Sequence, residues 1–234
     1  DLFFEKTRAN IPLIFIMNSW DNPSTGRFAS GKPDIFLAWG EQTRKHAIEY
    51  QGMNSSDVIG FGAAQFEVYS SQPKLSRKKF CQINEIDEDD TIILYAGGSL
   101  GTNEFDHLKL LEHQIESGVV KKSVVIYRPH PWGGGSNSAE KIIEGKWRHV
   151  KIESSMRDYL LQIKERGYHL TFPDYEYTHS VLSAADCVIS PLSTILIEAA
   201  LHGKPIMCFL PIEEIEARAF QTVHRFPHFQ DLQF

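Results

Sequence analysis

Three loops, each following an apolar run, carry residues able to bind a phosphate group or a sugar hydroxyl. The first contains Gly97, Gly98 and Ser99. Glycines let backbone N–H groups approach an anion, and the serine adds a hydroxyl donor. An ordinary strand-to-helix turn explains this loop equally well, because it has neither the Gly-Lys-Ser/Thr of a phosphate-binding loop nor a GxGxxG pattern.

The second loop is RPHPWGGG, residues 128–135, in which prolines stand on both sides of His130. Prolines restrict the backbone of the histidine and keep it out of a regular helix. Its imidazole N–H can then donate to a phosphate oxygen. A turn histidine bonded to a neighbouring carbonyl is the structural alternative, but the prolines, Arg128 and the glycine run favour a binding role.

The third loop, Ser190 to Thr194, leads into the segment ILIEAALHGKP. Ser193 or Thr194 is predicted to cap a helix there, whose free N–H groups and dipole would attract an anion. Glu198 lies about one turn inside that helix and could accept hydrogen bonds from two sugar hydroxyls. A simple cap with a solvated glutamate is the alternative, although it explains poorly a carboxylate within an otherwise apolar helix.

The elements around these loops alternate between continuous apolar strands and amphipathic helices, which is typical of an α/β fold with a parallel sheet covered on both faces. Because the carboxyl ends of parallel strands share one edge, we expect the three loops to converge on a diphosphate and a ribose. The strands are predicted at 91–98, 123–131, 149–153, 186–190 and 205–211, and the helices at 106–116, 156–166, 177–185 and 193–202.

The chain is predicted to hold two domains. Residues 1–72 read as the tail of an α/β domain, with strands at 11–17, 34–40 and 57–63 and a helix at 41–52 that ends at a glycine. Residues 73–90 are charged and have few apolar anchors, so they are interpreted as a linker, with a long surface loop as an equal alternative. Residues 91–234 form the predicted nucleotide-binding, Rossmann-like domain.

Composition limits the function classes. The 234 residues carry 24 lysines and arginines against 30 acids, a net charge of −6, which disfavours broad binding to nucleic acid. The three cysteines show no CxxC spacing, and Cys187 and Cys208 read as buried, reduced thiols of a cytoplasmic protein. No apolar run approaches the roughly 20 residues that span a bilayer. There is also no DxD triplet or His/Cys ligand cluster, so no metal or cofactor is expected.

The motif RPHP, followed by SxxSTxxxEAxxHGKP (Ser190 to Pro205), resembles the C-terminal domain of GT-B glycosyltransferases. The resemblance is closest to bacterial surface-polysaccharide transferases and CDP-glycerol glycerophosphotransferases. Ser19 to Asn22 and Pro33 to Tyr69 look like the end of the N-terminal domain of the same group.

The resemblance implies a transferase that moves a group from a nucleotide-diphosphate sugar or CDP-polyol to a glycan or lipid-linked acceptor, without a metal. It places His130, Ser193 and Thr194 on the diphosphate and Glu198 on the ribose. The catalytic base would come from the acceptor domain. Asp21 is the one candidate for that base within this sequence, and an ordinary turn aspartate is the favoured interpretation of it.

Such transferases need roughly 350 residues or more, so the chain is interpreted as a fragment that binds donor without turning it over. The full enzyme would be cytoplasmic, with peripheral association at the inner face of the membrane. Two other functions stay open: an isomerase resembling UDP-sugar 2-epimerases, and a non-catalytic nucleotide-binding module.

Overall fold

The computed structural model describes residues 2–24, 31–98, 102–132, 138–166, 171–209 and 227. The chain divides into two compact units, and the division falls between Glu67 and Val68. The sequence analysis places the end of the first domain at residue 72 instead. None of the described helices combines the length and the apolar character needed to cross a bilayer.

The first unit is built on a small parallel sheet with the strand order β1-β2-β3. Its elements are α1 (Leu2–Ala9), β1 (Ile14–Ile16), β2 (Ile35–Ala38), α2 (Glu41–Gln51), η1 (Ser55–Asp57) and β3 (Val58–Gly60). Helix α2 ends at Gly52, which adopts the left-handed conformation with φ 62°, so the predicted glycine stop is confirmed.

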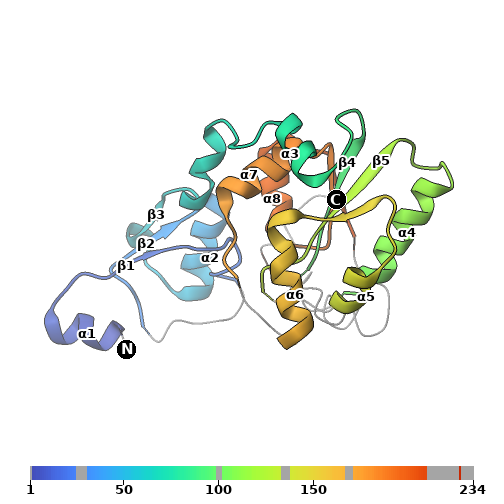
Figure 1. Ribbon diagram of the computed structural model, residues 1–234. Coiled ribbons are helices and arrows are strands. Elements are labelled where there is room, and N and C mark those ends of the chain that lie inside the picture. Colours follow the sequence, from blue (N-terminus) through green and yellow to red (C-terminus); the bar gives the residue numbers. More distant parts are fainter. Residues whose placement is uncertain are drawn as a thin grey trace. The chain divides into compact units, whose positions relative to one another are not determined.

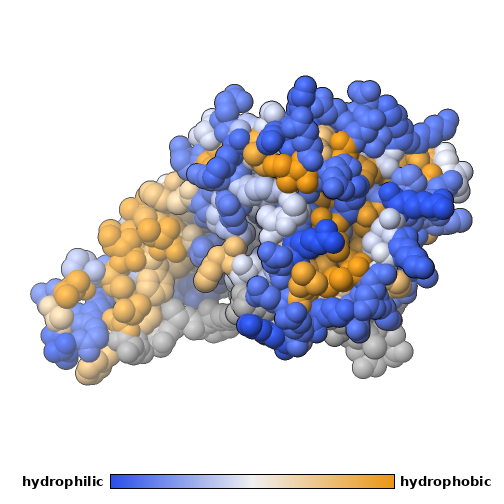
Figure 2. Space-filling model, viewed as in Figure 1, coloured by the Kyte–Doolittle hydropathy of each residue, from blue (hydrophilic) through white to orange (hydrophobic). Residues whose placement is uncertain are grey.

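One face of the first sheet packs on a core and the other stays open. Phe36, Ala38 and Val58 are buried together with Ala47 of α2. On the opposite face, Ile14, Ile16 and Ile59 are 52%, 60% and 48% exposed. Figure 2 shows hydrophobic residues gathered on this unit. An open apolar sheet face of this kind is unusual for a stable monomeric surface.

The second unit is a five-stranded, fully parallel sheet with helices on both faces (Figure 1). Its strands are β4 (Thr91–Ala96), β5 (Ser123–Arg128), β6 (Val150–Ile152), β7 (Cys187–Ser190) and β8 (Ile206–Cys208). Its helices are α3 (Arg77–Asn84), α4 (Glu104–Glu116), α5 (Ala139–Glu144), α6 (Arg157–Arg166), α7 (Tyr175–Ala184) and α8 (Ile195–Leu201), with 3-10 turns η2 (Ala64–Ser70), which contains the division, and η3 (Ser154–Met156).

Two apolar clusters hold the helices on this sheet. Alternate residues of each strand face opposite sides, so Tyr95 and Tyr127 join one cluster with α4, α5 and α6. Leu94 and Ile126 join the other, with α3, α7 and α8. The α/β fold class and the predicted strands are therefore present, although each strand is shorter than its apolar run.

The stretch 73–90, interpreted from its charge as a linker, contains a helix of the second unit. Ser76 caps α3 by accepting a hydrogen bond from the Lys79 N–H at 3.3 Å. Phe80 and Cys81 are 0% exposed and belong to the core with α7. Cys187 and Cys208, expected to be buried, are only partly buried, and all three cysteines are free.

The burial of α3 generates a stability prediction. Replacing Phe80 with alanine should lower the free energy of unfolding of the second unit by about 3–5 kcal/mol, because it leaves a cavity in the core. Ile83, on the same helix and 42% exposed, is the matched control, and its change to alanine should cost about 1 kcal/mol or less. Urea denaturation measures both, and equal effects would contradict the core role of α3.

Candidate functional site

The strand order of the second unit brings the three chemically interesting loops to one edge. The order is β6-β5-β4-β7-β8, so the chain winds outward in both directions from the β4–β7 pair. In open α/β sheets, ligands bind beyond the carboxyl ends of the strands at such a reversal. The loops after β5, β4 and β7 leave from three adjacent strands there, which confirms that they share an edge.

Arg128 is the last residue of β5, and buried side chains fix its guanidinium group. It pairs in register with Ala96 of β4, and it is 7% exposed. Its Nη2 donates to the Thr178 hydroxyl at 2.7 Å, and its Nη1 lies 3.5 Å from a carboxylate oxygen of Glu153, which is 0% exposed. The guanidinium is therefore fixed by a buried ion pair, and it supplies positive charge beneath the sheet edge.

Two buried polar atoms at this edge have no hydrogen-bond partner within the described residues. They are Nη1 of Arg128 and the hydroxyl of Ser190, the last residue of β7 and 0% exposed. Tyr95 of β4 pairs with Ile189, so Ser190 lies level with Ala96 and Arg128. Nη1 of Arg128 faces the Glu153 carboxylate at 3.5 Å as an ion pair, so the Ser190 hydroxyl is the atom that marks a place where a ligand or water oxygen would be stabilised.

His130 is oriented so that it can donate a hydrogen bond. Its Nδ1 accepts from the Trp132 backbone N–H at 3.1 Å, which places the ring proton on Nε2. The Tyr159 hydroxyl donates to the His130 carbonyl at 3.1 Å and fixes the backbone. In the described part of the chain, Nε2 makes no hydrogen bond. Burial lowers the pKa of His130 to about 4, so the ring is a neutral donor at neutral pH.

The backbone amides of the glycine turn after β4 are hydrogen-bonded to other groups of the protein. The Gly97 N–H donates to the Arg128 carbonyl at 2.9 Å, and the Gly98 N–H donates to Oε1 of Glu104 at 3.0 Å. Both amides that were expected to face an anion are thus already paired. Ser99 lies outside the described residues. A Cβ on Gly97 would stand 2.5 Å from Glu104 Oε1, so glycine is needed here for close packing.

Glu104 is a residue that the sequence analysis missed. It is the first residue of α4 and is 0% exposed. Besides the Gly98 amide, its carboxylate accepts from the Thr102 hydroxyl at 3.2 Å and from the Tyr127 hydroxyl. Burial raises its pKa to about 7, against the opposing effect of these three donors. The sequence shows Glu104 only as a carboxylate directly after Asn103, the residue that caps α4. A carboxylate in that position ordinarily indicates only the start of a helix.

Ser193 and Thr194 stand at the start of α8, although the helix begins at Ile195. Thr194 occupies the cap position but has a helical backbone, so its side chain makes no capping hydrogen bond. The predicted side-chain cap is therefore wrong. In the described chain the Ile195 N–H has no acceptor, while the Thr194 carbonyl accepts from the Ile197 N–H at 3.0 Å.

Glu198 is buried and paired rather than solvated. It is 7% exposed, and the Tyr69 hydroxyl donates to its Oε2. Burial raises the pKa of Glu198, while the Tyr69 hydrogen bond and the positive charge of Arg128 oppose the rise. Burial raises the pKa of Tyr175, and the negative charge of Glu198 adds to the rise. Glu198 thus lies among Tyr69, Tyr175 and Arg128, with Oε2 already occupied by a hydroxyl.

Two histidines, His179 and His202, form a hydrogen-bonded network next to Glu198. His179 is 5% exposed, and its Nε2 donates to the Ser71 carbonyl at 2.9 Å. Its Nδ1 lies 2.8 Å from Nε2 of His202, whose Nδ1 donates to the Glu198 carbonyl at 2.7 Å. The Tyr69 ring packs on both imidazoles. This network fixes Tyr69 and α8 together.

Asp21 lies in the first unit, in the turn after β1. Its carbonyl accepts from the Ser24 N–H at 3.0 Å, and Asn22 closes the turn through its side-chain oxygen, which accepts from the Ser19 N–H at 2.9 Å. This geometry is that of an ordinary polar turn.

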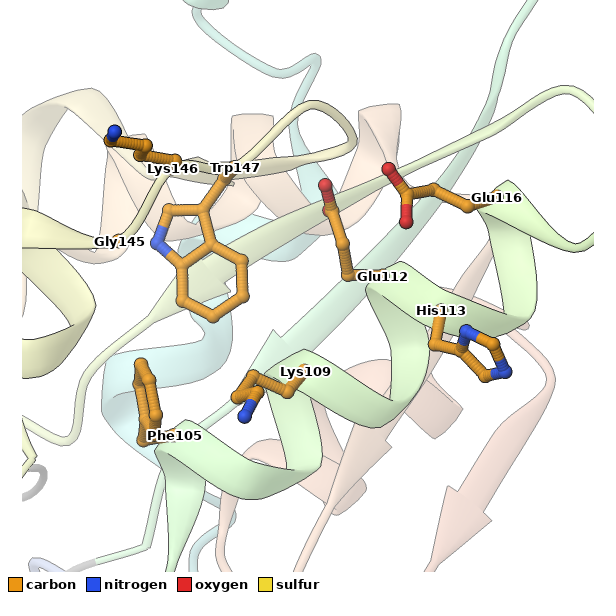
Figure 3. Close-up of a pocket in the computed structure, with 8 residues that line it drawn as sticks. All are labelled: Phe105, Lys109, Glu112, His113, Glu116, Gly145, Lys146 and Trp147. Carbon is orange, nitrogen blue, oxygen red and sulfur yellow. The ribbon is translucent and has the colours of Figure 1, made fainter.

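A surface pocket of about 320 Å³ lies on the second unit. Figure 3 shows the side chains that line it. The Glu112 carboxylate inside it accepts from the backbone N–H groups of Arg148 and His149, just before β6 begins. The pocket therefore runs along α4, and its Glu112 end lies at the amino ends of the strands, opposite the predicted site. Its lining residues are Phe105, Lys109, Glu112, His113, Glu116, Gly145, Lys146 and Trp147.

No family model matches the sequence, and neither does any curated protein. Among solved structures, S. aureus MnaA with UDP is similar at 11% identity and a TM-score of 0.55, over 98% of this chain and 65% of that one. The wall teichoic acid polymerase TagF (H444N variant with CDPG) is similar at 12% identity and a TM-score of 0.53, over 85% of this chain and 44% of TagF.

A UDP-N-acetylglucosamine 2-epimerase is also similar, at 14% identity and a TM-score of 0.48, over 81% of this chain and 43% of that one. The chain thus spans less than half the length of TagF and of this epimerase. At these identities the likeness shows the fold alone. The chain has an α/β fold of the GT-B type, as its motifs predict.

The buried carboxyl of Glu104 generates a pH prediction. Its pKa rises on folding from 4.5 to about 7, so the folded state holds the proton more tightly than the unfolded state. The stabilisation is fully present below pH 4.5 and is lost as the pH rises to 7. By linkage it amounts to about 3 kcal/mol relative to Glu104→Gln, which does not titrate.

Urea denaturation of both proteins between pH 4.5 and pH 8 measures this difference. A stability difference that stays constant across the range would contradict the raised pKa.

Proposed function

We propose that the second unit binds the nucleotide-diphosphate donor of a GT-B enzyme that transfers a glycosyl or polyol-phosphate group to a surface-polysaccharide type of acceptor. The observation that carries this proposal is the meeting of three polar strand ends at the β4–β7 reversal, within a GT-B-type sheet. The structures of TagF with CDPG and of MnaA with UDP support it, since both share the fold and are named with nucleotide ligands.

The geometry supports a role for each of these residues. His130 would donate Nε2–H to a phosphate oxygen, and it can do so at neutral pH because its pKa is low. The Ile195 N–H, which has no acceptor among the described residues, would add a donor at the start of α8, together with the hydroxyls of Ser193 and Thr194. Neutral and backbone donors of this kind stabilise a leaving diphosphate without a metal ion.

Glu198 would accept hydrogen bonds from the ribose. The Tyr69 hydroxyl holds Oε2, so ribose hydroxyls must share that oxygen, use Oε1, or displace Tyr69. Because Glu198 is buried, bulk water solvates its carboxylate poorly, and hydroxyl donors of a bound ribose would stabilise its charge.

Titration calorimetry with UDP, CDP, GDP and CMP tests the proposal. We expect a nucleoside diphosphate to bind, and His130→Ala or Glu198→Ala to weaken it by roughly 1–3 kcal/mol through lost hydrogen bonds. His113→Ala is the matched control, because His113 is exposed and lines the pocket at the opposite edge. EDTA should leave the affinity unchanged.

Equal nucleotide affinity of the wild type and both variants would show that His130 and Glu198 do not contact the nucleotide. If CMP bound as tightly as CDP, the site would not be one that recognises a diphosphate. Conversion of a nucleotide sugar by the protein without any acceptor would favour the isomerase over the transferase.

A further inference from the structure

One buried acid near the β4–β7 reversal, Glu104, has no role in the proposed binding of the nucleotide. Glu104 is 0% exposed and lies directly behind the glycine turn that ends β4. Its Oε1 holds the Gly98 amide, so the carboxylate and the turn are one rigid arrangement. The Gly98 amide that Glu104 holds lies just after β4, one of the two strands at the reversal, so the charge of a ligand bound there would act on this buried carboxylate.

The described surroundings of Glu104 supply donors but no charge. Tyr127 of β5 donates to its carboxylate, and the titratable groups around that tyrosine are Tyr95 of β4, Tyr159 of α6 and, bonded to the Tyr95 hydroxyl at 2.8 Å, His107 of α4. Among the influences on the pKa of Glu104, burial is the largest, and none that comes from the described residues is a charged side chain. Within the part of the chain that the structure describes, an ionised Glu104 is therefore a buried negative charge without a counter-ion.

A diphosphate brings further negative charge to this edge. Repulsion between the two anions would disfavour the ionised acid and leave the protonated form almost unaffected. The hydrogen bonds from Gly98 and Thr102 both go to Oε1, so Oε2 can carry a proton without breaking either. The turn can thus keep its shape while the charge behind it is removed.

We propose that Glu104 takes up a proton when the nucleotide-diphosphate donor binds, so that donor affinity is coupled to pH through this one carboxyl. The inference rests on the proposed function, since it assumes that the diphosphate lies at the β4–β7 edge. The proton comes from the buffer and forms one O–H bond on the carboxyl. Glu104 holds the glycine turn in place and acts on the donor through its charge, so it is not a catalytic residue.

The test is calorimetric titration of the whole chain with UDP-N-acetylglucosamine and, separately, CDP-glycerol. Their pyrophosphates are esterified at both ends and do not titrate near pH 7, so any proton uptake belongs to the protein. Titrations at pH 7 in PIPES and in imidazole, which differ in ionisation enthalpy, give the number of protons taken up. An acid with a pKa of about 7 is half ionised there, so about half a proton per site is expected.

The same coupling predicts that affinity falls about five- to tenfold between pH 6 and pH 8. In Glu104→Gln, whose amide oxygen can still accept from Gly98, both the proton uptake and this pH dependence should vanish while binding persists. Glu112→Gln is the matched control: it changes another buried acid of α4, at the opposite edge, and should keep the uptake. His130→Gln should bind more weakly with unchanged uptake, which excludes His130 as the acceptor.

The outcomes are distinguishable. Donor binding without proton uptake in the wild type, or equal uptake in Glu104→Gln, overturns this inference and leaves the proposed function standing. Failure of both donors to bind overturns the proposed function and the inference with it. Should Glu104→Gln not fold, the carboxyl-carbon NMR titration of wild-type Glu104 decides, because its pKa must rise when donor is added.

Discussion

A parallel sheet buried on both faces can carry polar chemistry only at its ends, and this constraint shapes the second unit. Nearly every residue of β4 and β5 is buried, so polar groups that bind a ligand can lie only at the ends of these strands. There the structure gathers Arg128, Ser190, Glu104 and Glu198, all buried. The apolar strands thus determine where the ionisable groups of this unit can act.

The strands and the binding edge could be predicted because each depends on local sequence. A run such as TIILYA is apolar at every position and is bounded by charged and glycine-rich segments, which fixes both its type and its place. Parallel strands then bring their carboxyl ends together whatever their order. The motif resemblance to GT-B enzymes agreed with the fold for the same reason, since its residues stand at those ends.

What sequence reasoning missed depends on pairings between distant residues. Helix α3 has a short apolar face within a charged stretch, and the burial of Phe80 comes from α7, about a hundred residues later. The hydroxyl of Tyr69 meets Glu198 across 129 positions, and His179 meets His202 across 23. The hydrophobic periodicity of a sequence does not indicate such contacts. The sequence analysis therefore treated Glu198 as open to a ligand, although its carboxylate is hydrogen-bonded to Tyr69 in the fold.

Gly97 and Glu104 constrain each other's replacement. Any side chain at position 97 would begin 2.5 Å from the carboxylate oxygen, so the Glu104 carboxylate would have to move away or be replaced by a shorter side chain. Either change would weaken or remove the hydrogen bonds from the Gly98 amide and the Tyr127 hydroxyl. A substitution at the glycine therefore acts on a residue seven positions along the chain, and a redesign of this turn has to consider both positions.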